Sequence, residues 1–214
     1  MSRYSLWSVY TKTKILEVSL ELFAKKGFDG VSVREIAKEV GVRESALYKH
    51  YKNKEDILEK IVEEMIVSIR SGYELRHVPE TLAVGVVEGY RNITEEQLCE
   101  MSWSIFKMFT EDFRLSNFRR LLMREQFQNK IIAEYYNKFF LKGVIESQSK
   151  TFLQLVDSGF FRKADERIIA LQFYGPILLL FQQYDCEPEK KDEIKEMLFK
   201  HVRAFGEYYR NQKE

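Results

Sequence analysis

The stretch from residue 32 to residue 51, SVREIAKEVGVRESALYKHY, constrains the fold more than any other part of the chain. Ser32 is a good N-cap, and Glu35 three residues later completes a capping box, so a helix of about two turns is expected to follow. Gly41 ends that helix, because glycine adopts the positive φ of a tight turn without steric cost. A second short helix then begins near Arg43. Two short helices joined through a glycine turn predict a helix-turn-helix.

The apolar residues of this stretch fit a close crossing of the two helices. Ile36, Ala37 and Val40 share one face of the first helix, and Leu47 and Tyr51, four residues apart, point inward from the second. The preceding segment, TKTKILEVSLELFAKKGF, has an apolar face of its own, formed by Ile15, Leu16, Leu20 and Phe23. The sequence therefore predicts a small domain of three helices.

The other faces of the second short helix combine aromatic, basic and hydroxyl side chains. Arg43, Ser45, Tyr48 and Lys49 lie on outward or flanking faces that a DNA major groove accepts. His50, together with Lys54 just beyond, is placed to hold the DNA backbone. The alternative is that Tyr48 and His50 edge the three-helix core and the lysines are merely solvated.

The charge distribution supports a nucleic-acid partner for this end of the chain. The net charge is +1, but residues 1–54 hold eleven Lys and Arg against six Asp and Glu, a surplus of +5. The remaining residues have a balance of −4. A small basic domain on a faintly acidic body is typical of a DNA-binding protein with a second task, although chance also produces a surplus of this size.

Apolar residues recur at intervals of three to four along almost the entire chain of 214 residues, and no alternating strand pattern is evident. A long fourth helix is expected over residues 55–75, and residues 129–156 are expected to form one long helix. Other helix starts are predicted at Pro79, at Thr94 with Gln97 as its capping partner, after Ala164 and after Pro188. The prediction is an all-α protein of about ten helices, with a DNA-binding domain at 9–69 and a larger helical domain at 70–214.

Several function classes are not expected. The longest apolar run, residues 168–181, is too short to span a membrane and no export signal opens the chain, so a soluble cytoplasmic protein is expected. His50, His77 and His201 lack ligand spacing, and Cys99 and Cys186 are isolated. No glycine-rich phosphate loop is present. The sequence predicts no enzyme activity, no metal and no cofactor.

Residues 11–64 resemble the N-terminal DNA-binding domain of the tetracycline-repressor (TetR) family of transcriptional regulators. The Leu-Tyr-x-His-aromatic signature of that family matches Leu47, Tyr48, His50 and Tyr51, and its lysine at the start of helix four matches Lys54. The resemblance implies that the Ser32 hydroxyl meets a DNA phosphate. The full set predicted to contact DNA is Ser32, Arg34, Arg43, Glu44, Ser45, Tyr48, Lys49, His50 and Lys54.

One position departs from the family pattern. Many members carry a small residue, preceded by Lys or Arg, where this chain has Glu44 and Ser45. Glu44 could accept a hydrogen bond from a cytosine amine, or it could instead stabilise the start of its helix, where the helix dipole is positive. The preferred base sequence is therefore left open.

The resemblance implies a homodimeric repressor that binds a palindromic operator and is released by a small-molecule effector, with the fourth helix acting as a lever. A DNA-binding dimer without a ligand is the alternative. The residues proposed to line an effector pocket, or otherwise to form ordinary core, are Met101, Trp103, Phe106, Phe109 and Phe113.

The first of the last two predicted helices is apolar nearly all round, so other parts of the protein must cover it on more than one face. The resemblance implies that this pair dimerises the protein, and the alternative is the central helix of a monomer. The predicted interface residues are Leu171, Tyr174, Leu178, Phe181, Met197 and Phe205.

Overall fold

The computed structural model describes residues 3–78 and 86–211, and this part of the chain is helical throughout. Within it, the only β-structure is an isolated bridge between Phe161 and Arg210. The helices are α1 (Arg3–Lys26), α2 (Val33–Val40), α3 (Glu44–Leu47), α4 (Lys54–Leu75), α5 (Val86–Asn92), α6 (Glu95–Thr110), α7 (Phe113–Glu125), α8 (Lys130–Phe140), α9 (Lys142–Asp157), α10 (Glu166–Cys186), the short 3-10 helix η1 (Pro188–Lys190) and α11 (Lys191–Tyr209). The all-α prediction is confirmed.

The helix start expected at Pro79 lies outside the described residues. None of the described helices combines the length and the apolar character needed to cross a membrane.

The chain divides into two compact units. The head unit contains residues 1–71 and 111–134, and the body unit contains residues 72–110 and 135–214. Residues 111–134 thus belong to the head unit, whereas the sequence pattern predicts that they belong to the domain at 70–214. Both α4 and α8 contribute residues to the two units.

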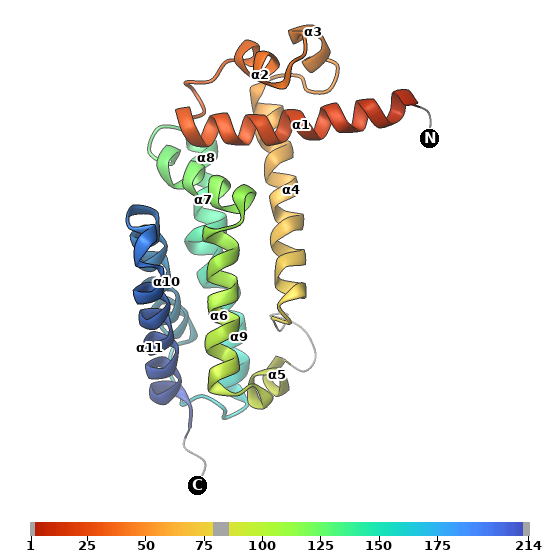
Figure 1. Cartoon of the computed structure of the whole chain (residues 1–214). Coiled ribbons are helices and arrows are strands. Elements are labelled where there is room, and N and C mark those ends of the chain that lie inside the picture. Colours follow the sequence, from red (N-terminus) through yellow and green to blue (C-terminus); the bar gives the residue numbers. More distant parts are fainter. Residues whose placement is uncertain (1–2, 79–85, 212–214) are drawn as a thin grey trace. The chain divides into compact units, whose positions relative to one another are not determined.

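In the head unit, α1, α2 and α3 gather around the first turns of α4 (Figure 1). Their shared core contains the apolar residues expected from the sequence, which are all at most 5% exposed: Ile15, Leu16, Leu20, Phe23, Ile36, Ala37, Val40, Leu47 and Tyr51. Ile57, Leu58 and Ile61 of α4 are also buried. Burial of these side chains removes apolar surface from water, which is the main force that holds such a small domain together.

A buried acid fastens α7 to the end of α1. The carboxylate of Glu125, a residue only 5% exposed, accepts hydrogen bonds from the Phe28 N–H at 3.3 Å and from Nε of Arg124 at 2.9 Å. Arg124 in turn donates to the carbonyl of Phe23 at 2.9 Å, one of the last carbonyls of α1. Gly27, with φ of 85°, leaves room for this carboxylate, since a Cβ there would lie 3.0 Å from it. These contacts explain why α7 belongs to the head unit.

One predicted helix is divided in the structure. The predicted long helix over residues 129–156 is two helices, α8 and α9, separated at Leu141. The Asn137 side chain accepts from the Lys142 N–H at 3.2 Å, and an ideal Cβ on Gly143 would lie only 2.0 Å from the carbonyl oxygen of Lys138. The side chain of Asn137 therefore competes with the helical hydrogen bonds, and glycine permits the close backbone approach that results.

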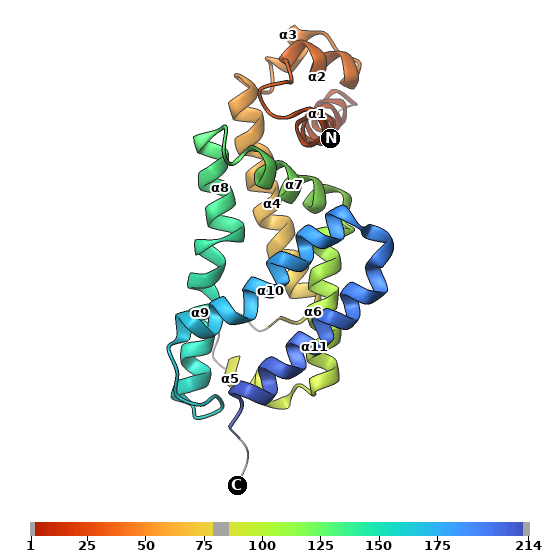
Figure 2. The same cartoon turned by 90° about the vertical axis from the view of Figure 1, so that its left-hand side faces the viewer.

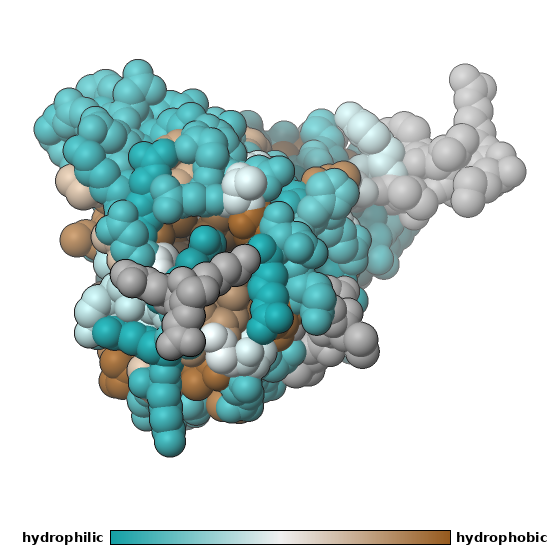
Figure 3. Space-filling model, turned by 90° about the horizontal axis from the view of Figure 1, so that it is seen from below, coloured by the Kyte–Doolittle hydropathy of each residue, from teal (hydrophilic) through white to brown (hydrophobic). Residues whose placement is uncertain are grey.

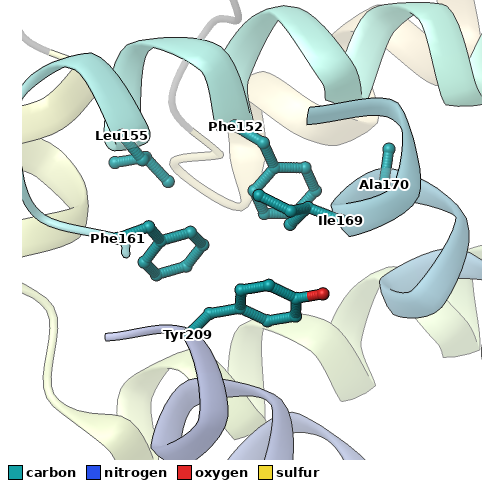
Figure 4. Close-up of a cluster of buried hydrophobic side chains, with 6 residues drawn as sticks. All are labelled: Phe152, Leu155, Phe161, Ile169, Ala170 and Tyr209. Carbon is teal, nitrogen blue, oxygen red and sulfur yellow. The ribbon is translucent and has the colours of Figure 1, made fainter. Parts of the chain in front are cut away.

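In the body unit, α10 and α11 lie side by side against α6 (Figure 2), and α9 packs against α10. The capping box that starts α6 is confirmed in both directions, because the Thr94 N–H donates to Oε1 of Gln97 at 2.9 Å and the Gln97 N–H donates to Oγ1 of Thr94 at 3.2 Å. A cluster at one end of the unit joins α9, α10 and α11 (Figure 4) and consists of Phe152, Leu155, Phe161, Ile169, Ala170 and Tyr209.

Candidate nucleic-acid interface

The turn between α2 and α3 has the geometry expected of a helix-turn-helix. Oγ of Ser32 accepts from the Glu35 N–H at 3.2 Å and caps α2. Gly41 ends α2 in the left-handed region, with φ of 84°, and its N–H donates to the Ala37 carbonyl at 3.0 Å. The Val42 N–H donates to the same carbonyl at 2.9 Å. The turn is therefore fixed by backbone hydrogen bonds that only this glycine conformation allows without strain.

Two side chains fasten the second helix inward, as predicted. Leu47 has no exposed surface and Tyr51 is 2% exposed. The Tyr51 hydroxyl donates to the carbonyl of Lys12 in α1 at 3.2 Å. Burial, together with the nearby carboxylates of Glu64 and Asp56, raises the pKa of Tyr51 far above its usual range. Tyr51 therefore remains a neutral hydrogen-bond donor at every physiological pH.

The second helix is shorter than the sequence predicts. Its α-helical part ends at Leu47, and Tyr48, Lys49 and His50 form a turn. In this turn the His50 N–H donates to the Leu47 carbonyl at 2.9 Å, which is a three-residue rather than a four-residue hydrogen bond. The tightened turn nevertheless carries the chain to Tyr51, whose N–H also bonds to Leu47.

The side chains predicted to face DNA are presented to solvent around this turn. Tyr48 is 53% exposed, and Arg43, Ser45 and Lys49 are exposed as well. This exposure argues against the alternative in which Tyr48 edges the core. His50 is half-buried, and its ring centroid lies 6.5 Å from that of Tyr51, so it does border the core.

Lys54 has a structural task in addition to the predicted one. Its ammonium donates to the carbonyls of Phe28 at 2.7 Å and Val31 at 3.0 Å, and it lies 4.4 Å from the centre of the Phe28 ring. These contacts tie the start of α4 to the loop between α1 and α2. Contact between Lys54 and DNA stays a prediction.

The two short helices take part in two ion pairs. Glu35 of α2 forms an ion pair with Lys26 at the end of α1, and the hydrogen bond from this lysine lowers the pKa of Glu35. On the exposed side, Nε of Arg34 lies 3.9 Å from Oε1 of Glu44. Ser32, Arg34 and Glu44 are all exposed or partly exposed, so the predicted set is open to solvent apart from Lys54 and the half-buried His50, and within it the structure brings Arg34 and Glu44 together.

Comparison with known proteins agrees with this geometry. The family described as "Bacterial regulatory proteins, tetR family" matches residues 15–61, which contain the turn and both short helices. The chain belongs to the TetR family. The match confirms the resemblance of the N-terminal segment to the DNA-binding domain of that family.

Individual relatives extend the comparison. The Staphylococcus epidermidis "Biofilm operon icaADBC HTH-type negative transcriptional regulator IcaR" is 44% identical over 52 residues, which are 24% of this chain and 28% of that protein. The Bacillus subtilis "Probable HTH-type transcriptional regulator YttP" is 30% identical over 146 residues, 66% of each chain. The alignments thus span less than two thirds of the length of either relative.

Among solved structures, the SmeT–triclosan complex has a TM-score of 0.71 at 20% identity, and the superposition covers 95% of this chain and 93% of SmeT. At this level of identity the similarity concerns the fold. The fold of SmeT is therefore shared by nearly the full chain, beyond the residues that the family model matches.

In this TetR-family chain, the residues predicted to line an effector pocket are mostly packed against one another. The rings of Trp103 and Phe106 stack with centroids 5.3 Å apart, and Phe106 stacks on Phe181 at 4.8 Å. Phe109 meets Phe181 edge-on at 6.0 Å. Met101 is half-buried, and the fifth predicted residue, Phe113, begins α7 in the head unit and is 58% exposed. Trp103, Phe106 and Phe109 therefore belong to an aromatic core with Phe181, and contact of the four body residues with an effector stays a prediction.

The predicted dimer residues fall into two groups. Leu171 and Met197 are 54% and 56% exposed, whereas Tyr174 and Phe181 are buried inside the protomer. Leu178 and Phe205 are half-buried. Three exposed apolar residues of the same helices were missed by the sequence analysis, namely Ile168, Leu179 and Tyr208. Their spacing was a usable signal, because residues 168, 171, 175 and 179 recur at helical intervals on α10.

A hollow of about 300 Å³ lies between the start of α6 and the end of α11. Leu98, Val202 and Gly206 supply apolar lining, and Glu95 and Arg210 are among its polar residues. The view from below in Figure 3 shows apolar surface surrounded by hydrophilic surface. This hollow was not anticipated from the sequence, because its lining comes from segments about one hundred residues apart.

Proposed function

We propose that the protein is a homodimeric repressor that binds an inverted-repeat operator in the cytoplasm and is released from it by a small-molecule effector. One observation carries the DNA-binding part of the proposal. Leu47 and Tyr51 are buried in the head core while Tyr48, Lys49 and Arg43 between and before them face solvent. This alternation leaves hydroxyl, aromatic and cationic groups open to solvent, and these are the kinds of group that bind the phosphates and base edges of a major groove.

Dimer formation is supported by the apolar residues exposed on α10 and α11. Ile168, Leu171 and Leu179 on α10, with Met197 and Tyr208 on α11, are between 48% and 66% exposed. Large apolar side chains recurring along two adjacent helices are typical of a surface that another protein covers. Two such pairs related by a twofold axis form a four-helix interface. The two heads of a dimer would then recognise half-sites about one DNA turn, roughly 34–36 Å, apart.

Effector control follows from linkage between the two binding events. If the effector prefers a dimer whose heads do not fit successive major grooves, its binding weakens DNA affinity by the ratio of its affinities for the two states. DNA then weakens effector binding by the same factor. SmeT, the similar structure solved in complex with triclosan, supports a small-molecule ligand for this chain.

The stacked packing of Trp103, Phe106 and Phe181 favours the second candidate function, a DNA-binding dimer without an effector. In that case the body unit only dimerises the protein. Calorimetric titration of the protein with apolar compounds, with and without bound operator DNA, separates the two. A compound that binds and releases the DNA supports the sensor, and DNA affinity that no bound compound changes supports the alternative.

Selection from random duplex DNA by the purified protein tests the DNA-binding proposal. We expect enrichment of an inverted repeat, and loss of binding to it in Tyr48→Ala and Lys49→Ala. Lys200→Ala, which removes an exposed lysine from α11, is the matched control and should leave DNA binding unchanged. Size-exclusion chromatography of each variant checks that the dimer persists. Failure of the protein to enrich any sequence would refute the proposal.

A further inference from the structure

Arg34 of α2 and Glu44 of α3 form an unusual pair on the solvent-facing side of the helix-turn-helix. Nε of Arg34 and Oε1 of Glu44 lie 3.9 Å apart, and the two side chains are 88% and 48% exposed. An exposed ion pair with this geometry contributes little to folding. The distance is also longer than a hydrogen bond, so the guanidinium and the carboxylate attract each other while their hydrogen-bonding edges remain available.

Glu44 lies in the first turn of α3, yet the hydrogen bonds of this helix leave its carboxylate available. One sequence-based alternative was a role at the start of α3, yet Arg43 is the N-cap and makes no side-chain hydrogen bond there. Among the described residues, no hydrogen bond joins the Glu44 carboxylate to a backbone N–H of α3. A carboxylate on a surface that faces DNA is unfavourable by itself, because the phosphates repel it. The neighbouring Arg34 offsets that repulsion.

The order of groups in the pair matches one base pair. Across the major groove a G·C pair presents two acceptors, N7 and O6 of guanine, followed by the N4 donor of cytosine. A guanidinium beside a carboxylate offers donors followed by an acceptor, which is the complementary order. An A·T pair presents an acceptor, a donor and an acceptor, so the guanidinium would meet the adenine amine and the carboxylate would meet O4 of thymine.

We infer that Arg34 and Glu44 act as one base-reading element that selects a G·C pair in each operator half-site. Arg34 donates to guanine and Glu44 accepts from the cytosine amine. This inference rests on the proposed function, since it assumes that α2 and α3 enter a major groove. It goes further by naming the base pair and by assigning its two halves to residues from different helices.

The test is selection from random duplex DNA with the full-length protein and four variants. Glu44→Ala and Arg34→Ala each remove one member of the pair, and Glu44→Gln keeps the size of the side chain while replacing an acceptor-only group by an amide. Glu39→Ala is the matched control, because Glu39 is an exposed carboxylate of α2 outside the predicted DNA-contacting set. Circular dichroism and thermal melting confirm that every variant is folded.

We expect the wild-type motif to contain one G·C pair per half-site that the pair of residues selects. In both Glu44→Ala and Arg34→Ala the preference for this G·C pair should fall by about tenfold or more, equivalent to ~1.4 kcal/mol. The preference at all other positions should persist. Glu44→Gln should accept adenine in place of cytosine, since an amide binds adenine through its N6 and N7 edge. Glu39→Ala should strengthen binding to all sequences slightly, through reduced phosphate repulsion, without changing the motif.

Two results overturn the inference while the proposed function stands. One is an unchanged motif in Glu44→Ala, and the other is loss of preference at different base pairs in Glu44→Ala and Arg34→Ala. If the wild-type protein itself enriches no sequence, the proposed function fails and the inference fails with it. The behaviour of the wild-type protein therefore distinguishes the two failures.

Discussion

Glu125→Ala should destabilise the head unit strongly, although Glu125 lies about 100 residues from the segments that it holds. The carboxylate is 5% exposed and accepts from the Phe28 N–H at 3.3 Å and from Arg124 at 2.9 Å. The substitution leaves the N–H of Phe28, a residue 2% exposed, without this acceptor, which costs about 1–3 kcal/mol. The ion pair with Arg124 adds only ~1 kcal/mol, because the Arg124 side chain is 42% exposed and screened by water.

The expected total is a loss of about 2–4 kcal/mol of unfolding free energy. For a protein of this size it corresponds to a fall in Tm of roughly 5–15 °C. Urea denaturation followed by circular dichroism measures the loss, and thermal melting measures the fall in Tm. Glu17→Ala, which removes an exposed carboxylate from α1, is the control and should change stability by at most about 0.5 kcal/mol. Equal stability of the two variants would refute the reasoning, because it would mean that the buried hydrogen bonds do not fasten α7 to α1.

Three further predictions concern other parts of the molecule. Lys54→Met should lower the unfolding free energy measured by urea denaturation by about 1–2 kcal/mol, because the ammonium that bonds to Phe28 and Val31 is lost while the aliphatic stem remains. Unchanged stability would contradict a structural role for Lys54. Leu179→Glu should convert the proposed dimer to a folded monomer in sedimentation experiments, and a persisting dimer would argue for another interface. Burial lowers the pKa of His201, so the folded imidazole stays neutral while the unfolded one takes up a proton below about pH 6.5. Stability should therefore fall between pH 7 and 5.5 in the wild type, and Tm measurements should show a smaller fall in His201→Gln.

Local features of the helix-turn-helix were predictable because they depend on neighbours in the sequence. The Ser32 cap, the left-handed Gly41 and the inward placement of Leu47 and Tyr51 each follow from spacings of ten residues or fewer. The prediction that the second helix continues to Tyr51 was wrong, because its α-helical part ends at Leu47. The choice between three-residue and four-residue hydrogen bonds in this short turn depends on how Tyr51 is anchored to α1.

The second half of the chain shows the limit of the same reasoning. Helical periodicity identifies Trp103, Phe106 and Phe109 as apolar, but it cannot say whether such rings face a ligand or each other. The structure stacks Phe106 between Trp103 and Phe181, a partner 75 residues away. Core packing and pocket lining use the same residue types, and only the three-dimensional neighbours separate them.

By itself, the sequence determined the all-α class, the helix-turn-helix and which side chains of its second helix face inward or outward, because caps, turns and amphipathic periods are encoded within one or two helical turns. Tertiary structure decided that α7 belongs with the head, that α8 and α9 are separate and that Arg34 lies beside Glu44. Each of these depends on contacts between residues distant in the sequence or on competition between alternative hydrogen bonds. The packing of α7 joins residues about 100 positions apart, whereas in the other two cases the folded backbone selects among competing contacts of nearby residues, so the residue pattern alone does not decide the outcome.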